Sequence, residues 1–276
     1  VVDQRLRLLA ALLLAAEHSE RIELMTSIAV AFARSPMTVA NMAHDLNAYS
    51  KGRFILGLGS QIKPHITRRF SMPWSKPAAR MREFILAMRA IWDCWYEGKP
   101  LEFQGEFYSH TLMTPMFTPT NTQSGPPRVF LAAVGPRMTA VSGEVADGLI
   151  AHGFTTERYM REVTLPSLAE GLARGGRDRR DFEVTCPVFV VSGADEQSTQ
   201  ASRKAACQQL AFYGSTPTYR PVLELHGWED VGVELTALSK RGEWVKMGTL
   251  IDDEMLDAFA IVSEPEDVPD RIVERF

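Results

Sequence analysis

Glycine-containing segments follow two apolar runs of the chain and could carry the chemistry of a binding site. They are Gly57-Leu58-Gly59-Ser60-Gln61 and Gly135-Pro136-Arg137-Met138-Thr139. Glycine lets a backbone come close to another group, and the polar residues that follow can form hydrogen bonds with a ligand. The first segment alone would also fit an ordinary tight turn, so its interpretation depends on how often the pattern recurs.

The second segment has the composition of a phosphate-binding helix start. Proline at the first position of a helix leaves the following amide groups free, and a helix N-terminus attracts anions. Arg137 and Thr139 could add a positive charge and a hydroxyl group. A plain turn between a strand and a helix is the alternative interpretation.

A histidine stands where a proton donor would be useful. His152 ends an apolar run and precedes Gly153, and the usual near-neutral pKa of imidazole suits proton transfer. A structural histidine is the alternative, and His65 and His110 are weaker candidates in loops. The sequence contains no metal-ligand spacing, and Gly57-x-Gly59 lacks the third glycine of a dinucleotide fingerprint.

The elements that would position these residues alternate between strand and helix. Predicted strands span residues 22–27, 53–58, 129–133, 149–152 and 182–191, with a short extended piece at 259–262. Predicted helices span 3–18, 36–49, 77–97, 136–145, 156–174 and 194–213, with further helix within 214–258 and from 265 onward. Loops or insertions occupy 59–76 and 99–127, the second with a hairpin near 101–108. Repeated strand–helix–strand units predict a parallel sheet, either open and doubly wound or closed as a barrel.

Small or flexible residues follow several of these strands, which favours the barrel. They occur at 27–28, 57–60, 134–136 and 152–153. An open sheet gathers ligand residues mainly at one switch point, whereas a barrel gathers them from many strand ends around one rim. We therefore expect an α/β fold of the (β/α)₈ TIM-barrel type in a single domain over residues 1–276.

Composition excludes several classes of protein. The 276 residues are 45% hydrophobic and 23% charged, with a net charge of −4, which gives no reason to expect nucleic acid or an anionic membrane as partner. Cys94, Cys186 and Cys207 are far apart and odd in number, as expected for reduced thiols of a cytoplasmic protein. No apolar run is long enough to span a membrane.

Several longer segments resemble the bacterial luciferase-like superfamily. The resemblance lies in residues 23–36, 52–60, 132–138 and 143–148, and residues 70–83 resemble the branch that uses the deazaflavin coenzyme F420. It implies a (β/α)₈ barrel that holds the coenzyme at its carboxyl-terminal rim and moves a hydride through C5 of the ring.

The resemblance also implies roles for individual residues. Ser27 and Ile28 match a non-proline cis peptide whose bulge backs the ring, and Gly57, Gly59 and Ser60 match positions along the ring and its side chain. Gln61 departs from the usual glycine. Gly135, Pro136, Arg137 and Met138 match the phosphate site. We further expect Lys63, Arg68 or Arg69 near the acidic tail of the coenzyme, and Phe70 and Trp74 in an apolar substrate pocket.

Family members have additional elements before the region that matches Asp3 and after the region near Phe276. Five convincing strands stand where the barrel needs eight, so we expect strands to be missing at both ends. Exposed edges would favour association, and we expect a homo-oligomer, such as a dimer. On this expectation, the proton donor of the family could lie outside these residues.

Three hypotheses remain for the function. The first is an F420-dependent oxidoreductase acting on a small organic molecule. The second is a luciferase-like monooxygenase that uses FMN and dioxygen. The third is a catalytically inactive barrel fragment that binds a ligand or partner.

Overall fold

The computed structural model describes residues 7–275, which form two compact units. The first unit comprises Val1–Ala133, Arg137–Ile150 and Ser167–Thr185, and the second comprises Val134–Pro136, Ala151–Pro166 and Cys186–Phe276. Each unit has its own apolar core. Whether both belong to the single domain expected from the sequence stays a prediction.

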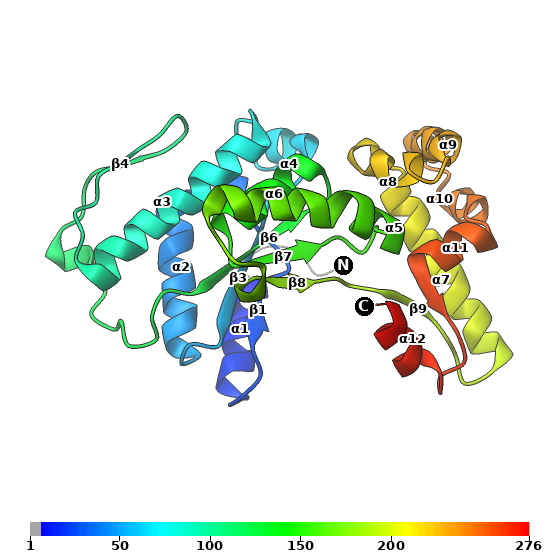
Figure 1. Ribbon diagram of the computed structural model, residues 1–276, viewed down its shortest axis with the longest axis horizontal. Coiled ribbons are helices and arrows are strands. Elements are labelled where there is room, and N and C mark those ends of the chain that lie inside the picture. The colour runs from blue at the N-terminus through cyan, green and yellow to red at the C-terminus, as the bar shows by residue number, and fades with distance from the viewer. Residues whose placement is uncertain (1–6, 276) are drawn as a thin grey trace. The chain divides into compact units, whose positions relative to one another are not determined.

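A parallel sheet forms the centre of the first unit (Figure 1). Over the described residues its strands run in the order β1-β3-β6-β7-β8, and β2 also pairs with β3. Their bounds are β1 Leu24–Met25, β2 Ala29–Val30, β3 Phe54–Gly59, β6 Arg128–Ala133, β7 Gly148–Ala151 and β8 Glu183–Thr185. Parallel pairing of sequential strands through helices confirms the predicted α/β architecture.

Helices α2 and α3 pack against each other and begin and end where local sequence signals predict. The helices of this part of the chain are α1 Arg7–Glu17, α2 Pro36–Tyr49, α3 Pro77–Glu97, α4 Pro136–Val145 and α6 Leu165–Gly175. The Ser35 side chain accepts a hydrogen bond from the Thr38 amide at the start of α2, and Gly98 ends α3 with φ of 68°. An N-cap hydroxyl and a left-handed glycine satisfy backbone groups that helix ends leave unpaired.

The two faces of β3 pack against different partners. Phe54, Leu56 and Leu58 join the core that contains the buried side chains of α2 and α3. Ile55 points to the opposite face, where it packs with Phe130 and Ile150. This alternation is expected of a strand whose two faces are both covered.

Irregular segments follow β3 and α3. The loop after β3 contains a π-helical turn, His65–Arg69. Beyond α3, β4 (Phe103–Gln104) and β5 (Ser109–His110) pair as an antiparallel hairpin. The Glu83 carboxylate on α3 accepts hydrogen bonds from three consecutive amides of the hairpin turn, those of Glu106, Phe107 and Tyr108. The predicted hairpin is therefore present, and the Glu83 carboxylate binds its turn to α3.

The second unit combines a two-stranded parallel ladder with helices of different lengths. Its strands are β9 Phe189–Val191 and β10 Ala260–Val262. Its helices are α5 Glu157–Tyr159, α7 Glu196–Gly214, α8 Arg220–Glu224, α9 Glu229–Arg241, α10 Trp244–Met247, α11 Asp253–Phe259 and α12 Val268–Arg275. Across residues 7–275, no helix combines the length and apolar character needed to cross a membrane.

The predicted strand at residues 182–191 is wrong as a single element. The structure divides it into β8, which ends at Thr185, and β9, which begins at Phe189. Pro187 lies in the break, and proline has no amide hydrogen to give to a strand ladder.

Candidate functional site

One extra residue separates β1 from β2 where both pair with β3. Met25 pairs with Ile55, and Ala29 pairs with Leu58. Between these two pairs the β1–β2 segment advances four residues, whereas β3 advances three. The extra residue makes a β-bulge, and we call residues 26–28 the β1–β2 bulge. The strand predicted for residues 22–27 is present but shorter, because β1 spans only Leu24–Met25 before the bulge. The expected cis peptide between Ser27 and Ile28 is present.

The bulge explains both glycines of β3. A Cβ atom on Gly57 would lie 1.8 Å from the Thr26 carbonyl oxygen and 2.9 Å from Ile150 Cδ1. A Cβ on Gly59 would lie 2.5 Å from Ile28 Cδ1. The group that these glycines accommodate is therefore the chain's own bulge, and a contact of Gly57 or Gly59 with a coenzyme stays a prediction.

Ser60 and Gln61 continue from β3 at the carboxyl-terminal edge of the sheet. Leu58 pairs with Leu131 in a parallel register, so Ser60 and Ala133, each two residues further on, lie at the same edge. Gln61 has φ of 59°, a left-handed conformation that favours glycine. The Gln61 side chain accepts a hydrogen bond from the Ile62 amide at 3.2 Å, and Ser60 Oγ donates to the Gln61 carbonyl.

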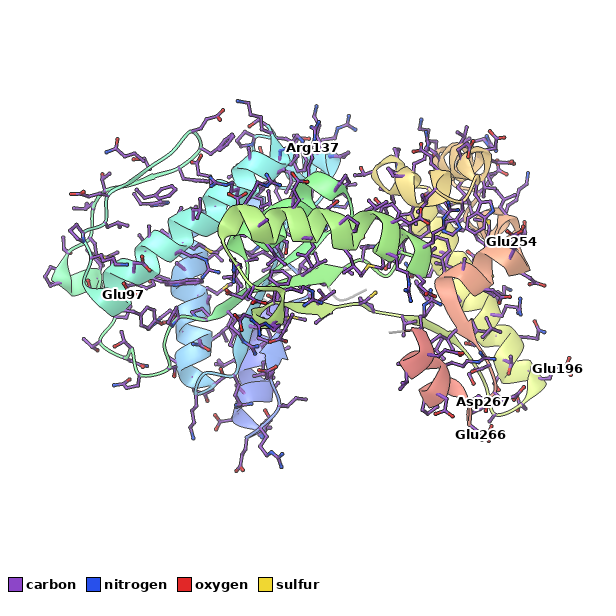
Figure 2. The ribbon with its side chains drawn as sticks, in the orientation of Figure 1. Glu97, Arg137, Glu196, Glu254, Glu266 and Asp267 are labelled. Atoms are coloured by element: carbon purple, nitrogen blue, oxygen red, sulfur yellow. The ribbon has the colours of Figure 1, made fainter. Side chains whose placement is uncertain are left out.

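The turn from β6 to α4 contains the predicted phosphate segment. Pro136 is the first residue of α4, as expected from its fixed φ. Apart from Gly135 itself and its two chain neighbours, no described atom lies within 4 Å of the position where a Cβ on Gly135 would stand. Arg137 is exposed at the start of α4 (Figure 2), whereas Met138 packs against the core of the first unit. The backbone at Gly135 thus has open space beside it, which would suit a phosphate group.

Basic side chains lie in the loop that follows Gln61. Lys63, Arg68 and Arg69 are exposed, and the Arg69 guanidinium lies 5.3 Å from the centre of the Phe70 ring. These side chains give the loop positively charged groups that could attract an acidic ligand.

Phe70 and Trp74 are half-buried and pack against the core of the first unit. The Trp74 ring meets Phe32 edge to face, with 5.7 Å between ring centres. Both side chains therefore hold the loop in place, and their proposed contact with a substrate stays a prediction.

Sequence reasoning missed Arg80, which fastens the same loop. Its side chain is 6% exposed. Nε donates to the Tyr108 hydroxyl at 2.8 Å, and a terminal nitrogen donates to the Pro73 carbonyl at 2.7 Å. The guanidinium also lies 4.6 Å from the centre of the Phe32 ring. The only signal in the sequence is an arginine in the first helical turn after an aromatic loop.

His152 belongs to the second unit and has a different pKa from the one expected. Its ring packs against Tyr213 and Tyr219, at 4.7 and 4.6 Å between centres, and burial lowers its pKa to about 4. Nδ1 accepts a hydrogen bond from the Phe154 amide at 3.0 Å, so the proton of the neutral ring lies on Nε2. The expectation of a near-neutral pKa is wrong, because desolvation disfavours the charged imidazolium.

The two weaker histidine candidates, His65 and His110, belong to different elements of the structure. His65 begins the π-helical turn, and His110 ends the hairpin strand β5. Burial lowers the pKa of His110. Within residues 7–275, no group of three or more His, Cys, Asp or Glu side chains could hold a metal ion.

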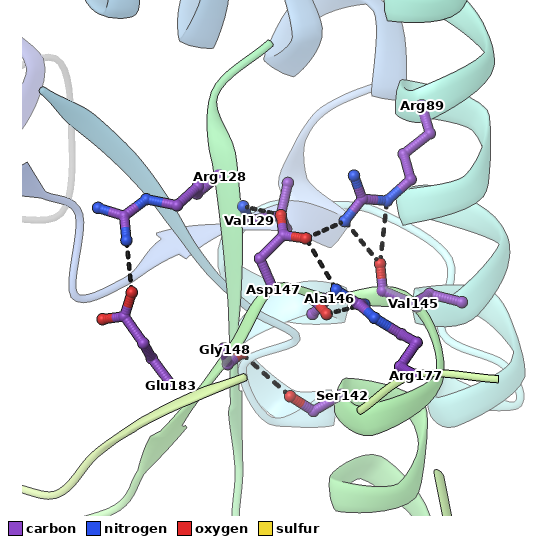
Figure 3. A network of polar contacts seen from close by, with 10 residues as sticks. All are labelled: Arg89, Arg128, Val129, Ser142, Val145, Ala146, Asp147, Gly148, Arg177 and Glu183. Atoms are coloured by element: carbon purple, nitrogen blue, oxygen red, sulfur yellow. Dashed lines mark hydrogen bonds and ion pairs between the residues drawn. The ribbon is translucent and has the colours of Figure 1, made fainter. Parts of the chain in front are cut away.

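A polar network lies at the start of β6 and β7 (Figure 3). The Asp147 carboxylate accepts hydrogen bonds from Arg89 at 2.9 Å, Arg177 at 3.0 Å and the Val129 amide at 2.8 Å. Asp147 precedes β7 and Val129 is near the start of β6, so the network lies at the amino-terminal edge of the sheet. It is therefore a stabilising feature at the edge opposite to Ser60.

The parallel sheet, with helices between its successive strands, identifies the chain as an α/β protein of the TIM-barrel type. The model of the luciferase-like monooxygenase family matches residues 6–276, and this chain belongs to that family. Its fold resembles the structure of the coenzyme F420-dependent tetrahydromethanopterin reductase from Methanopyrus kandleri, with a TM-score of 0.76 and 24% identity. The match covers 97% of this chain and 78% of the reductase.

Sequence relatives point in the same direction. An uncharacterised protein of Mycobacterium tuberculosis is 61% identical over 251 residues, 91% of this chain and 74% of that protein. The 5,10-methylenetetrahydromethanopterin reductase of Archaeoglobus fulgidus is 30% identical over 247 residues, 87% of this chain and 69% of the reductase. The resemblance inferred from short segments of the sequence is therefore confirmed.

Proposed function

We propose that this protein is an oxidoreductase that transfers a hydride between coenzyme F420 and a small organic substrate. The observation that carries the proposal is the alignment of strand ends at one edge of the sheet. Ser60 and the end of β6 lie at that edge, where ligands of parallel α/β folds bind. The β1–β2 bulge stands opposite Gly57 within β3, and β2 continues from it toward the same edge. The F420-dependent reductase with the same fold supports the choice of coenzyme.

The residues present fit a phosphorylated, acidic coenzyme. The open space beside Gly135 leaves room for a phosphate at the start of α4, with Pro136, Arg137 and Met138 around it. Ser27, Ile28, Gly57, Gly59, Ser60 and Gln61 would lie along the deazaflavin and its side chain. Exposed Lys63, Arg68 and Arg69 supply positive charge for the acidic tail. When bound, the coenzyme supplies the hydride donor or acceptor.

Phe70 and Trp74 would then form part of the substrate side, in a loop that Arg80 holds by its bond to the Pro73 carbonyl. His152 remains a candidate proton donor only through the Nε2–H group of a neutral ring, because its pKa is lowered to about 4. Its close packing against two tyrosines makes a structural role the competing explanation.

Coenzyme binding to the purified protein tests the proposal. F420 fluorescence titration should give saturable binding, and FMN should bind at least about tenfold more weakly. Gly135→Ala places a methyl group where no described atom interferes, so the fold should persist while F420 affinity falls about tenfold. Gly153→Ala is the matched control, because a Cβ there meets ordinary contacts at 3.6 Å and beyond. Wild-type affinity in Gly135→Ala would reject this phosphate site.

A flavin-dependent monooxygenase is the second candidate, favoured by the monooxygenases that give the family its description. It predicts that FMN binds more tightly than F420 and that reduced FMN on the protein consumes dioxygen. An inactive barrel fragment is the third candidate, and it predicts that neither coenzyme binds at tens of micromolar.

A further inference from the structure

The Thr26 side chain makes an unusual pair of hydrogen bonds within the β1–β2 bulge. Its side chain is fully buried. Thr26 Oγ1 donates to the Gly57 carbonyl at 2.8 Å and accepts from the Gly57 amide at 2.9 Å. One hydroxyl thus binds both backbone groups of a single residue on the neighbouring strand.

The register of the sheet explains why a side chain is used here. Backbone pairing with β3 occurs on either side of the bulge, at Ile55 and at Leu58. Gly57 lies between these two points, opposite the extra residue. The Thr26 hydroxyl therefore takes the place that backbone groups occupy in an uninterrupted ladder.

Packing around Gly57 and Gly59 leaves the bulge little freedom. The Thr26 carbonyl oxygen would be 1.8 Å from a Cβ on Gly57, and the Ile28 side chain fills the space beside Gly59. A shift of the bulge along β3 would therefore move Ile28 relative to Gly59, immediately before Ser60. By bonding to Gly57, the Thr26 hydroxyl therefore fixes the position of Ile28 relative to Gly59.

We propose that Thr26 is a positioning residue for coenzyme binding, acting through Ser27 and Ile28 rather than by touching the coenzyme. The inference rests on the proposed function, which places the coenzyme against the bulge. Serine and threonine are the small side chains that can donate and accept at the same atom. Valine has the shape of threonine but would leave the amide and carbonyl of Gly57 buried without this partner.

The test compares F420 affinity in Thr26→Val and Thr26→Ser, measured by fluorescence titration together with the absorbance spectrum of the bound coenzyme. We expect Thr26→Val to weaken F420 binding at least about tenfold, because the buried amide and carbonyl of Gly57 lose their hydrogen-bond partner. Thr26→Ser should keep the affinity within about threefold and preserve the spectrum of the bound coenzyme.

Ser142→Ala is the matched control for stability. Ser142 is fully buried, and its hydroxyl donates to the Gly148 carbonyl at 3.1 Å. Gly148 begins β7, at the opposite edge of the sheet. Ser142→Ala should lower the urea midpoint of unfolding while leaving F420 affinity unchanged, so a general loss of stability would not imitate the effect of Thr26→Val.

Thr26→Ala is the second variant, in case Thr26→Val does not fold. The smaller side chain leaves space for water beside Gly57, so the chain should fold and bind F420 at least about fivefold more weakly. Wild-type affinity in a folded Thr26→Val or Thr26→Ala protein overturns the inference, as does an equal loss in Thr26→Ser. If the wild-type protein binds neither F420 nor FMN, the proposed function fails, and the inference fails with it.

Discussion

At the scale of single residues, Gln61 departs from the family pattern. The resemblance implies glycine at this position, and the structure gives Gln61 a left-handed backbone with φ of 59°. Glycine adopts this conformation without a steric cost, whereas a residue with a Cβ does so less readily. The side-chain bond from the Ile62 amide to Gln61 Oε1 supplies a local stabilising contact.

His152 predicts how stability depends on pH. Its pKa is about 4 in the folded chain and about 6.5 when unfolded, so the unfolded state binds more protons between these values. The free energy of unfolding should therefore fall as the pH drops from about 6.5 toward 4. Between pH 7 and pH 5 the wild-type protein should lose about 2 kcal/mol more than His152→Asn.

Urea unfolding at both pH values measures this difference. Asparagine is a suitable replacement because its side-chain oxygen can accept the hydrogen bond from the Phe154 amide. Burial also lowers the pKa of His44, His110 and His226, but these groups titrate in both proteins and cancel in the comparison. Equal losses in the two proteins would mean that His152 titrates normally.

At the scale of elements, the two edges of the parallel sheet have different roles. Ser60 lies at the carboxyl-terminal edge, and the bulge that Thr26 holds against Gly57 leads toward it through β2. Asp147 ties β6 to α3 at the other edge, through the Val129 amide and Arg89. In parallel α/β folds, polar groups at the amino-terminal edge stabilise the fold and those at the carboxyl-terminal edge bind ligands.

Asp147→Asn tests this division. The change removes a half-buried charge that binds Arg89 and Arg177, and should lower the free energy of unfolding by about 2 kcal/mol. F420 affinity should not change. Glu162→Gln is the control, because its ion pair with Arg158 is exposed on both sides and contributes little to stability. Loss of coenzyme affinity in Asp147→Asn would contradict the separation of the two edges.

At the scale of the whole molecule, coenzyme binding should appear as added stability. A ligand that binds only the folded state at a hundred times its Kd raises the free energy of unfolding by about 2.7 kcal/mol. F420 should therefore raise the thermal midpoint, measured by circular dichroism, whereas NADH at the same concentration should not. An unchanged midpoint with F420 would count against the proposed function. A homodimer stays a prediction, which sedimentation velocity would test.

Much of the fold was predictable because its signals are local. Ser35 and Pro36 mark the start of α2, and Pro77 and Gly98 mark the limits of α3, through backbone groups only a few residues away. Strands β3, β6 and β7 were predictable from apolar runs with glycine in or close after them, whereas β2 was not predicted. The break at Pro187 had the same kind of signal, but the apolar run around it favoured a single strand.

The candidate site was predictable only in part. The segments at Ser27, Ser60 and Gly135 were predicted from the sequence. The hydrogen-bond partners of individual side chains were not. Neither the Thr26 bonds to Gly57 nor the Arg80 bond to Pro73 has a signature in local spacing.

The sequence by itself determined the order of strands and helices, their approximate limits and the family to which the chain belongs. Those features follow from periodicity, capping residues and short motifs along the chain. The tertiary structure alone decided the register of the bulge against β3, the neighbours that exclude a Cβ at Gly57 and the lowered pKa of His152. Each depends on groups that are distant in sequence and become neighbours only when the chain folds.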